Sequence, residues 1–125
     1  MPRHISILFP GQGSQYIGML DDLPTELVES FRSLALEALC FDIIDLIKNG
    51  NEEDLNKTSI TQPAILLTSF IYFKHLQNSI NFKADLMCGH SLGEYSALVA
   101  SNSITLGDAL KLVYQRGLLM ENTLK

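Results

Sequence analysis

The sequence GHSLG at residues 89–93 could carry nucleophilic chemistry, because it fits the pattern G-x-S-x-G with Ser91 at its centre. An apolar run precedes it at residues 84–88 and a run with helical spacing follows at 94–100, which is the strand–turn–helix context that the motif requires. A sharp turn would lift the Ser91 hydroxyl out of the backbone, and small residues on both sides would relieve crowding. The alternative interpretation is a glycine-rich turn that only joins a strand to a helix.

The same turn would supply part of an oxyanion site, since it leaves the N–H of Leu92 at a helix N-terminus, aimed where an oxyanion would form. A serine hydroxyl also needs a base within hydrogen-bond reach. His90 adjoins the serine, but neighbouring positions on a strained turn point their side chains apart. His4 and His75 have no motif around them. None of the three histidines is therefore a good candidate for the base.

Two strands and several helices must position these residues. The segments at residues 5–9 and 84–88 predict strands, and the first of them ends at Pro10. Alternating strands and helices favour an α/β fold with a parallel sheet, but such a sheet needs more than two strands and cover on both faces. The sheet is therefore expected to be incomplete in this chain. Helices are expected at residues 26–39, at 41–47, from a start at 58–63 with Pro63 near the first helical position to about 77, at 94–100, and from 106 to about 122 with Thr105 as its cap.

The composition excludes several classes of protein. The chain has 125 residues, of which 46% are hydrophobic and 18% charged, a balance typical of a core-forming globular protein. Its formal net charge is -5 and its nine Lys and Arg are scattered singly, which argues against nucleic-acid binding. Cys40 and Cys88 have no metal-ligand spacing, and Cys88 is expected to be a buried thiol. No apolar run suits a membrane span or a signal peptide, so we expect a soluble cytoplasmic protein without a metal or a membrane partner.

Four motifs stand together in the order and spacing of one known family. They are FPGQGSQ at residues 9–15, TQPA at 61–64, GHSLGEYSAL at 89–98 and QRG at 115–117. With them the chain resembles malonyl-CoA:acyl carrier protein transacylases, whose acyltransferase fold also serves fatty acid and polyketide synthases. The resemblance covers the whole chain but only the first part of the family's length. It implies an α/β-hydrolase-like parallel sheet flanked by helices. Residues 1–125 would then be the N-terminal part of the catalytic domain, without the small ferredoxin-like subdomain and the C-terminal part.

The resemblance also implies a role for each matching residue. Ser91 looks like the nucleophile that takes the malonyl group as an ester, and the backbone N–H of Gln12 looks like the second oxyanion donor beside that of Leu92. Arg116 resembles the family's clamp for the free carboxylate of malonate, which a guanidinium can hold by two parallel hydrogen bonds. Gln62 is expected to line the same pocket. The family's catalytic histidine lies downstream, in residues that this chain does not have.

Each of these roles has a plainer alternative. The glycine-rich loop around Gln12 can be just a tight turn, Arg116 can be a surface arginine near a helix C-terminus, and Gln62 can be a polar residue at a helix start.

The implied activity is transfer of malonyl from malonyl-CoA to the phosphopantetheine thiol of acyl carrier protein, without a cofactor, in fatty acid biosynthesis. One alternative is a G-x-S-x-G esterase, although an esterase needs no carboxylate clamp. Another is a non-catalytic remnant that keeps only the first half of the fold. Without a base, the 125-residue chain is expected to be a poor enzyme. Its uncovered apolar faces should also make it associate or aggregate.

Overall fold

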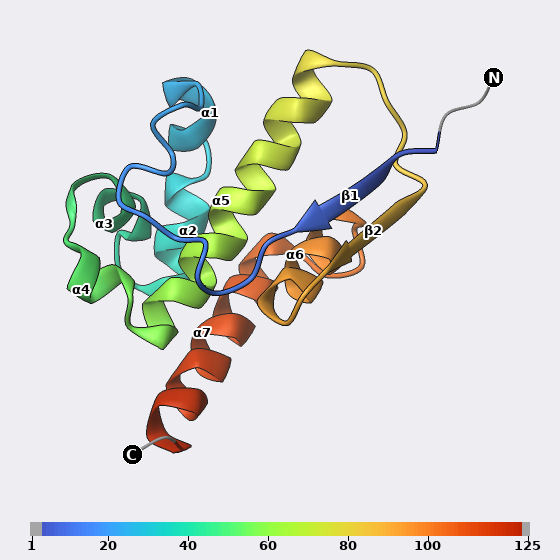
Figure 1. Ribbon diagram of the computed structural model, residues 1–125. Coiled ribbons are helices and arrows are strands. Elements are labelled where there is room, and N and C mark those ends of the chain that lie inside the picture. Colours follow the sequence, from blue (N-terminus) through green and yellow to red (C-terminus); the bar gives the residue numbers. More distant parts are fainter. Residues whose placement is uncertain (1–3, 124–125) are drawn as a thin grey trace.

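The computed structural model describes residues 4–123, which form two strands and seven helices (Figure 1). A long helix, α5, runs through the middle of the molecule, with α1 to α4 on one side of it and the strands at the other. The α/β class expected from the sequence is confirmed. The elements are β1 (Ser6–Phe9), α1 (Thr25–Glu29), α2 (Arg32–Leu39), α3 (Ile43–Asn49), α4 (Glu52–Leu55), α5 (Thr58–Ser79), β2 (Leu86–Gly89), α6 (Leu92–Ala100) and α7 (Leu106–Thr123).

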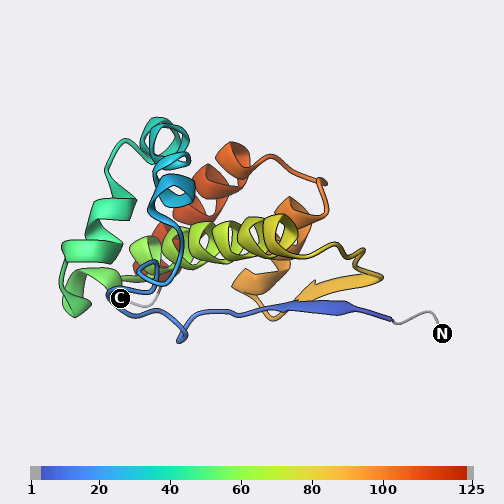
Figure 2. The ribbon, with the colours of Figure 1, turned by 90° about the horizontal axis from the view of Figure 1, so that it is seen from above.

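The two strands pair in parallel, and the helices lie on one side of them (Figure 2). The register places Ile7 opposite Met87 and Phe9 opposite Gly89. Side chains alternate along a strand, so Ile7, Phe9 and Met87 share the face that packs on α5 and α6. There Phe9 is buried against Phe73 of α5, with their ring centroids 6.0 Å apart. The sheet is thus held to the helices through one face only.

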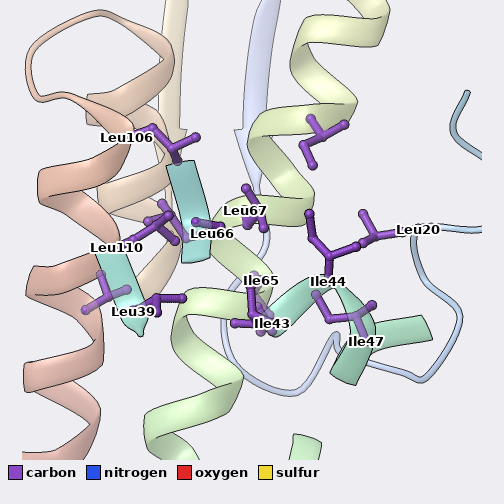
Figure 3. Packing of buried hydrophobic residues seen from close by; sticks show 14 of the residues in the cluster. Leu20, Leu39, Ile43, Ile44, Ile47, Ile65, Leu66, Leu67, Leu106 and Leu110 are labelled. Atoms are coloured by element: carbon purple, nitrogen blue, oxygen red, sulfur yellow. The ribbon is translucent and has the colours of Figure 1, made fainter. Parts of the chain in front are cut away.

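The main core lies between α5 and the helices around it (Figure 3). Helix α5 is buried on nearly all sides from Thr61 to Thr68, and the apolar residues from Ile65 onward predicted a buried helix. It packs on α7, α6 and α3. The fully buried aliphatic side chains of this core include Leu20, Ile43, Ile44, Ile47, Ile65, Leu66, Leu67 and Leu110.

Helix α7 follows the sequence-based expectation closely. Its buried residues are the ones that the helical spacing predicted, namely Leu106, Ala109, Leu110, Val113 and Gly117. Thr105 also caps the helix, because its hydroxyl accepts the backbone N–H of Asp108 at 3.2 Å. The inward face of α7 was readable because its apolar residues recur at helical spacing along one side.

The single helix expected at residues 26–39 was wrong. The chain forms α1 and α2 instead, with a break at Ser30 and Phe31. Arg32 holds this corner, since its guanidinium donates to Glu29 at 2.6 and 2.9 Å and also to Asp42. Asp42 in turn caps α3. Arg32 therefore links α1, α2 and the start of α3 at the point where the first of them ends.

The expected start of α5 was right in part. The helix begins at Thr58, the first residue of the expected range, but Pro63 lies inside the helix and beyond its first turn rather than near the first helical position. A short additional helix, α4, follows α3, and it begins where the Asn51 side chain accepts the backbone N–H of Asp54 at 2.8 Å.

The outer face of the sheet is uncovered within residues 4–123. Leu8 is 73% exposed and Leu86 57%, and Cys88 on the same face is half-buried rather than buried as expected. A cavity of about 540 Å³ also opens between β1 and α5. Parallel strands are normally apolar and covered on both faces, so this apolar face is unusually exposed for a parallel sheet. Within the described residues no helix has the length and hydropathy needed to cross a bilayer.

This exposed face predicts self-association of the 125-residue chain. Replacing Leu8 by Lys should weaken association by about tenfold or more, because a buried leucine contributes about 1.5–3 kcal/mol. Sedimentation equilibrium over a concentration series measures this. Leu119→Lys is the matched control, since Leu119 is 67% exposed on α7, away from the sheet. Equal effects of the two variants, or a wild-type chain that stays monomeric throughout, would contradict the prediction.

Candidate active site

Ser91 lies at a sharp turn between the end of β2 and the start of α6. Its backbone has φ 56° and ψ -110°, a conformation that residues with a side chain rarely adopt. The glycines on both sides make the turn possible. A Cβ on Gly89 would lie 2.1 Å from the carbonyl carbon of Gly93, and one on Gly93 would lie 2.2 Å from the carbonyl oxygen of Phe9. The motif therefore forms the elbow that the sequence predicted, with an exposed serine at its tip.

Leu92 is the first residue of α6, and its side chain is buried. Helix geometry leaves its N–H without an acceptor inside the helix, next to the Ser91 hydroxyl in sequence. The positive end of the α6 dipole lies at the same point. This is a suitable place for a negatively charged oxygen.

The glycine-rich loop after β1 packs beside the elbow. A Cβ on Gly11 would lie 2.7 Å from the carbonyl oxygen of His90, so the two turns are in contact. The Gln12 side chain reaches toward α5, where its amide lies 3.3 Å from the hydroxyl of Thr58. Gln15 anchors the loop more firmly, because its amide donates to Asn56 at 2.7 Å. Sequence reasoning missed this role of Gln15.

Arg116 connects three helices at the site. From α7 its Nη2 donates to Ser91 Oγ at 3.1 Å, and its Nη1 donates to Gln62 Oε1 at 2.9 Å. Its guanidinium carbon also lies 5.3 Å from the centre of the Tyr95 ring, within cation–π range. The structure thus brings Ser91, Gln62 and Arg116 together, as the family resemblance implied.

Gln62 is fully buried, with both ends of its amide in use. Its oxygen accepts from Arg116, and its nitrogen lies 3.1 Å from the sulfur of Met120. The sulfur can accept but cannot donate, so it sets the amide with its oxygen toward the arginine. Neither Met120 nor Tyr95 was singled out from the sequence. Tyr95 stands four residues after Ser91, one turn along α6, and only this spacing could have suggested it.

No histidine among residues 4–123 bonds to the nucleophile candidate. The partner of Ser91 Oγ there is Arg116. His90 and His4 are exposed, and His75 lines the cavity beside β1. No three His, Cys, Asp or Glu side chains in the same part of the chain lie close enough together to hold a metal ion.

The site thus consists of a serine at a strand–helix turn whose hydroxyl accepts a hydrogen bond from an arginine. The family model of the acyl transferase domain matches residues 7–124, so this chain belongs to that family.

Within the family, similar curated proteins include malonyl CoA-acyl carrier protein transacylases. The one from Haemophilus influenzae is 45% identical over 123 residues, which are 95% of this chain and 39% of the relative. The one from Escherichia coli K12 is 43% identical over 118 residues, 93% of this chain and 38% of the relative. The chain therefore spans about two fifths of these relatives' length, at their N-terminal end.

Solved structures agree with these relatives. The transacylase from Coxiella burnetii superposes with a TM-score of 0.91 at 39% identity. The match covers 97% of this chain and 39% of the Coxiella chain. A malonyl-transacylase in complex with a polyketide synthase acyl carrier protein superposes with a TM-score of 0.90 at 44% identity. The match covers 96% of this chain and 40% of the transacylase chain. The resemblance inferred from the four motifs is thus confirmed.

The backbone of Ser91 predicts a difference between two small substitutions. Ser91→Ala keeps the Cβ in the left-handed region, whereas Ser91→Gly relieves a strain of about 1–3 kcal/mol. Against this, glycine lowers the free energy of unfolding by about 0.4–1 kcal/mol, because it gives the unfolded chain more conformational freedom. The Ser91→Gly variant should therefore be more stable than Ser91→Ala by about 1 kcal/mol. Both variants lose the same bond to Arg116, and urea unfolding compares them directly. An alanine variant as stable as the glycine variant would show that the turn is unstrained.

Proposed function

We propose that this chain is the nucleophile-bearing part of a malonyl-CoA:acyl carrier protein transacylase, acting in fatty acid biosynthesis. The observation that carries the proposal is the position of Arg116, whose guanidinium lies within hydrogen-bond distance of Ser91 Oγ. An arginine at this distance from a nucleophile suits an acyl group that ends in a carboxylate. The names of the relatives support the same substrate.

In the first step Ser91 Oγ attacks the thioester carbonyl of malonyl-CoA. An oxygen–carbon bond forms, the carbon–sulfur bond breaks, and coenzyme A leaves as the thiol with the proton that Ser91 loses. The N–H groups of Leu92 and Gln12 stabilise the oxyanion that forms on the way. In the second step the phosphopantetheine thiol of acyl carrier protein attacks the seryl ester, and Ser91 regains its proton. The neighbouring structure of a malonyl-transacylase with an acyl carrier protein supports this partner.

Arg116 holds the malonyl carboxylate during both steps. That carboxylate stands one methylene beyond the ester carbonyl, so it reaches the guanidinium when the acyl group is on Ser91. Gln62 and Tyr95 fix the plane of the guanidinium from two sides, which preserves its two-pronged geometry. The malonyl group then replaces the Ser91 hydroxyl as the partner of Nη2.

The catalytic base is proposed to come from the part of the family's length that this chain does not span. The same part would extend the sheet toward an α/β-hydrolase-like fold and would include the ferredoxin-like subdomain. The chain described here would then be the N-terminal part of the catalytic domain. The cytoplasmic location expected from the sequence stays a prediction.

Mass spectrometry tests the nucleophile. The chain is extended to family length with the C-terminal part of the Haemophilus influenzae relative and mixed with malonyl-CoA. We expect one malonyl group on Ser91, and none after Ser91→Ala. The 125-residue chain by itself should show turnover lower by several orders of magnitude, because a serine without a base is a weak nucleophile. An adduct on another residue removes Ser91 from the mechanism. Hydrolysed malonyl-CoA without an adduct favours the esterase, and no reaction favours a non-catalytic remnant.

The carboxylate clamp predicts a change in substrate preference. In the same extended chain, Arg116→Ala should lower kcat/KM for malonyl-CoA by roughly 10- to 100-fold relative to acetyl-CoA, because a hydrogen bond to a charged group contributes about 1.5–3 kcal/mol. Lys111→Ala, an exposed change on the same helix, is the control and should leave the ratio unchanged. If Arg116→Ala slows malonyl and acetyl transfer equally, the arginine is structural and the clamp is wrong.

A further inference from the structure

Helices α5 and α7 touch backbone to backbone next to the site. A Cβ on Gly117 would lie 2.5 Å from the Cα of Ser59 and 2.8 Å from the carbonyl oxygen of Thr58. Only glycine allows this approach, so the point of contact between the helices is fixed at one position on each. Gly117 directly follows Arg116, so the contact lies beside the residue that reaches Ser91.

A carboxylate spans the same contact one turn further along α7. Glu121 Oε1 accepts both the backbone N–H and the hydroxyl of Ser59, each at 2.7 Å. Ser59 is the second residue of α5. The first turn of that helix has no acidic residue, and Lys57 at its N-cap provides no side-chain cap. Glu121 therefore acts as the cap of a helix to which it does not belong.

The N-terminus of α5 favours the negative charge of Glu121, because the helix dipole is positive there. Sequence reasoning passed over Glu121 because the helix that uses the carboxylate is 62 residues away in the chain.

We propose that Glu121 is the positioning residue for Arg116, and that it does this by locking α7 against the first turn of α5. Gln62 stands three residues after Ser59 on α5, and Arg116 five residues before Glu121 on α7. One residue of α-helix rises 1.5 Å, so a slip of a single residue between the helices would break the 2.9 Å bond from Arg116 to Gln62. The inference rests on the proposed function, in which this arginine selects the carboxylated acyl group.

Three variants of the family-length chain test the role of Glu121. Glu121→Ala should lower the malonyl-to-acetyl ratio of kcat/KM by about tenfold, since it removes two hydrogen bonds to a charged acceptor. Glu121→Gln should restore most of the ratio, because an amide oxygen accepts the same two bonds. Ser59→Ala removes only the hydroxyl contact and should give a smaller effect in the same direction. Glu37→Ala, an exposed glutamate of α2, should change nothing.

A double-mutant cycle with Arg116→Ala separates positioning from general stability. Glu121→Ala should cause no further fall in the ratio once the arginine is gone. An equal loss of malonyl and acetyl transfer, or a loss of the ratio that persists in the Arg116→Ala background, overturns the proposal.

A spectroscopic measurement keeps the test independent of catalysis. The side-chain N–H signals of Arg116 should be resolved and slowly exchanging in the wild-type protein, and averaged in Glu121→Ala. If they stay unchanged while the Ser59 amide loses its protection, Glu121 stabilises α5 without positioning Arg116, and the proposal is wrong. If instead Arg116→Ala leaves the malonyl-to-acetyl ratio unchanged, the clamp is wrong, and the Arg116 signals alone decide the role of Glu121.

Discussion

The close approach of α7 to α5 at Gly117 and Ser59 is the constraint on which the site depends. It allows no side chain between the two helices, so it sets the depth at which α7 lies against the core. Arg116 and Met120 then face Gln62 from α7, and the buried amide has a partner at each end. A buried amide with both ends satisfied has one orientation, so it can hold a guanidinium in one plane.

The nucleophile depends on a second close approach, between the elbow and the strand beside it. Gly93 lies against the carbonyl of Phe9 and Gly89 lies against Gly93, so the backbone of Ser91 has no freedom to relax. Parallel pairing of β1 with β2 places the two loops that follow them at the same edge of the sheet. The glycine-rich loop and the serine therefore meet where ligands of α/β proteins usually bind.

Local sequence patterns were enough to predict much of this arrangement. The elbow at Ser91 and the inward face of α7 were predicted because each depends on residues close together in the sequence. The break between α1 and α2 was missed because helical spacing continues across it, while the contact of Arg32 with Asp42 that marks it joins separate elements. The place of Pro63 within α5 was misjudged because proline is common at a helix start. Motif matching pointed to Gln62 and Arg116. It could not point to Met120 or Glu121, which lie outside the motifs and whose roles come from contacts between helices.

The pairing of β1 with β2 has a consequence for how the chain folds. Ile5 and Asp85 close the sheet at its outer end, where Asp85 accepts the Ile5 N–H at 2.8 Å across 80 residues of sequence. Closing a loop of that length costs about 4 kcal/mol of chain entropy, whereas α5, α6 and α7 meet through shorter connections. The helices should therefore assemble first, with β1 docking last. Local unfolding would release the same strand first. The loop that carries Gln12 would then move away from Ser91 together with β1, while Arg116 on α7 stays in place.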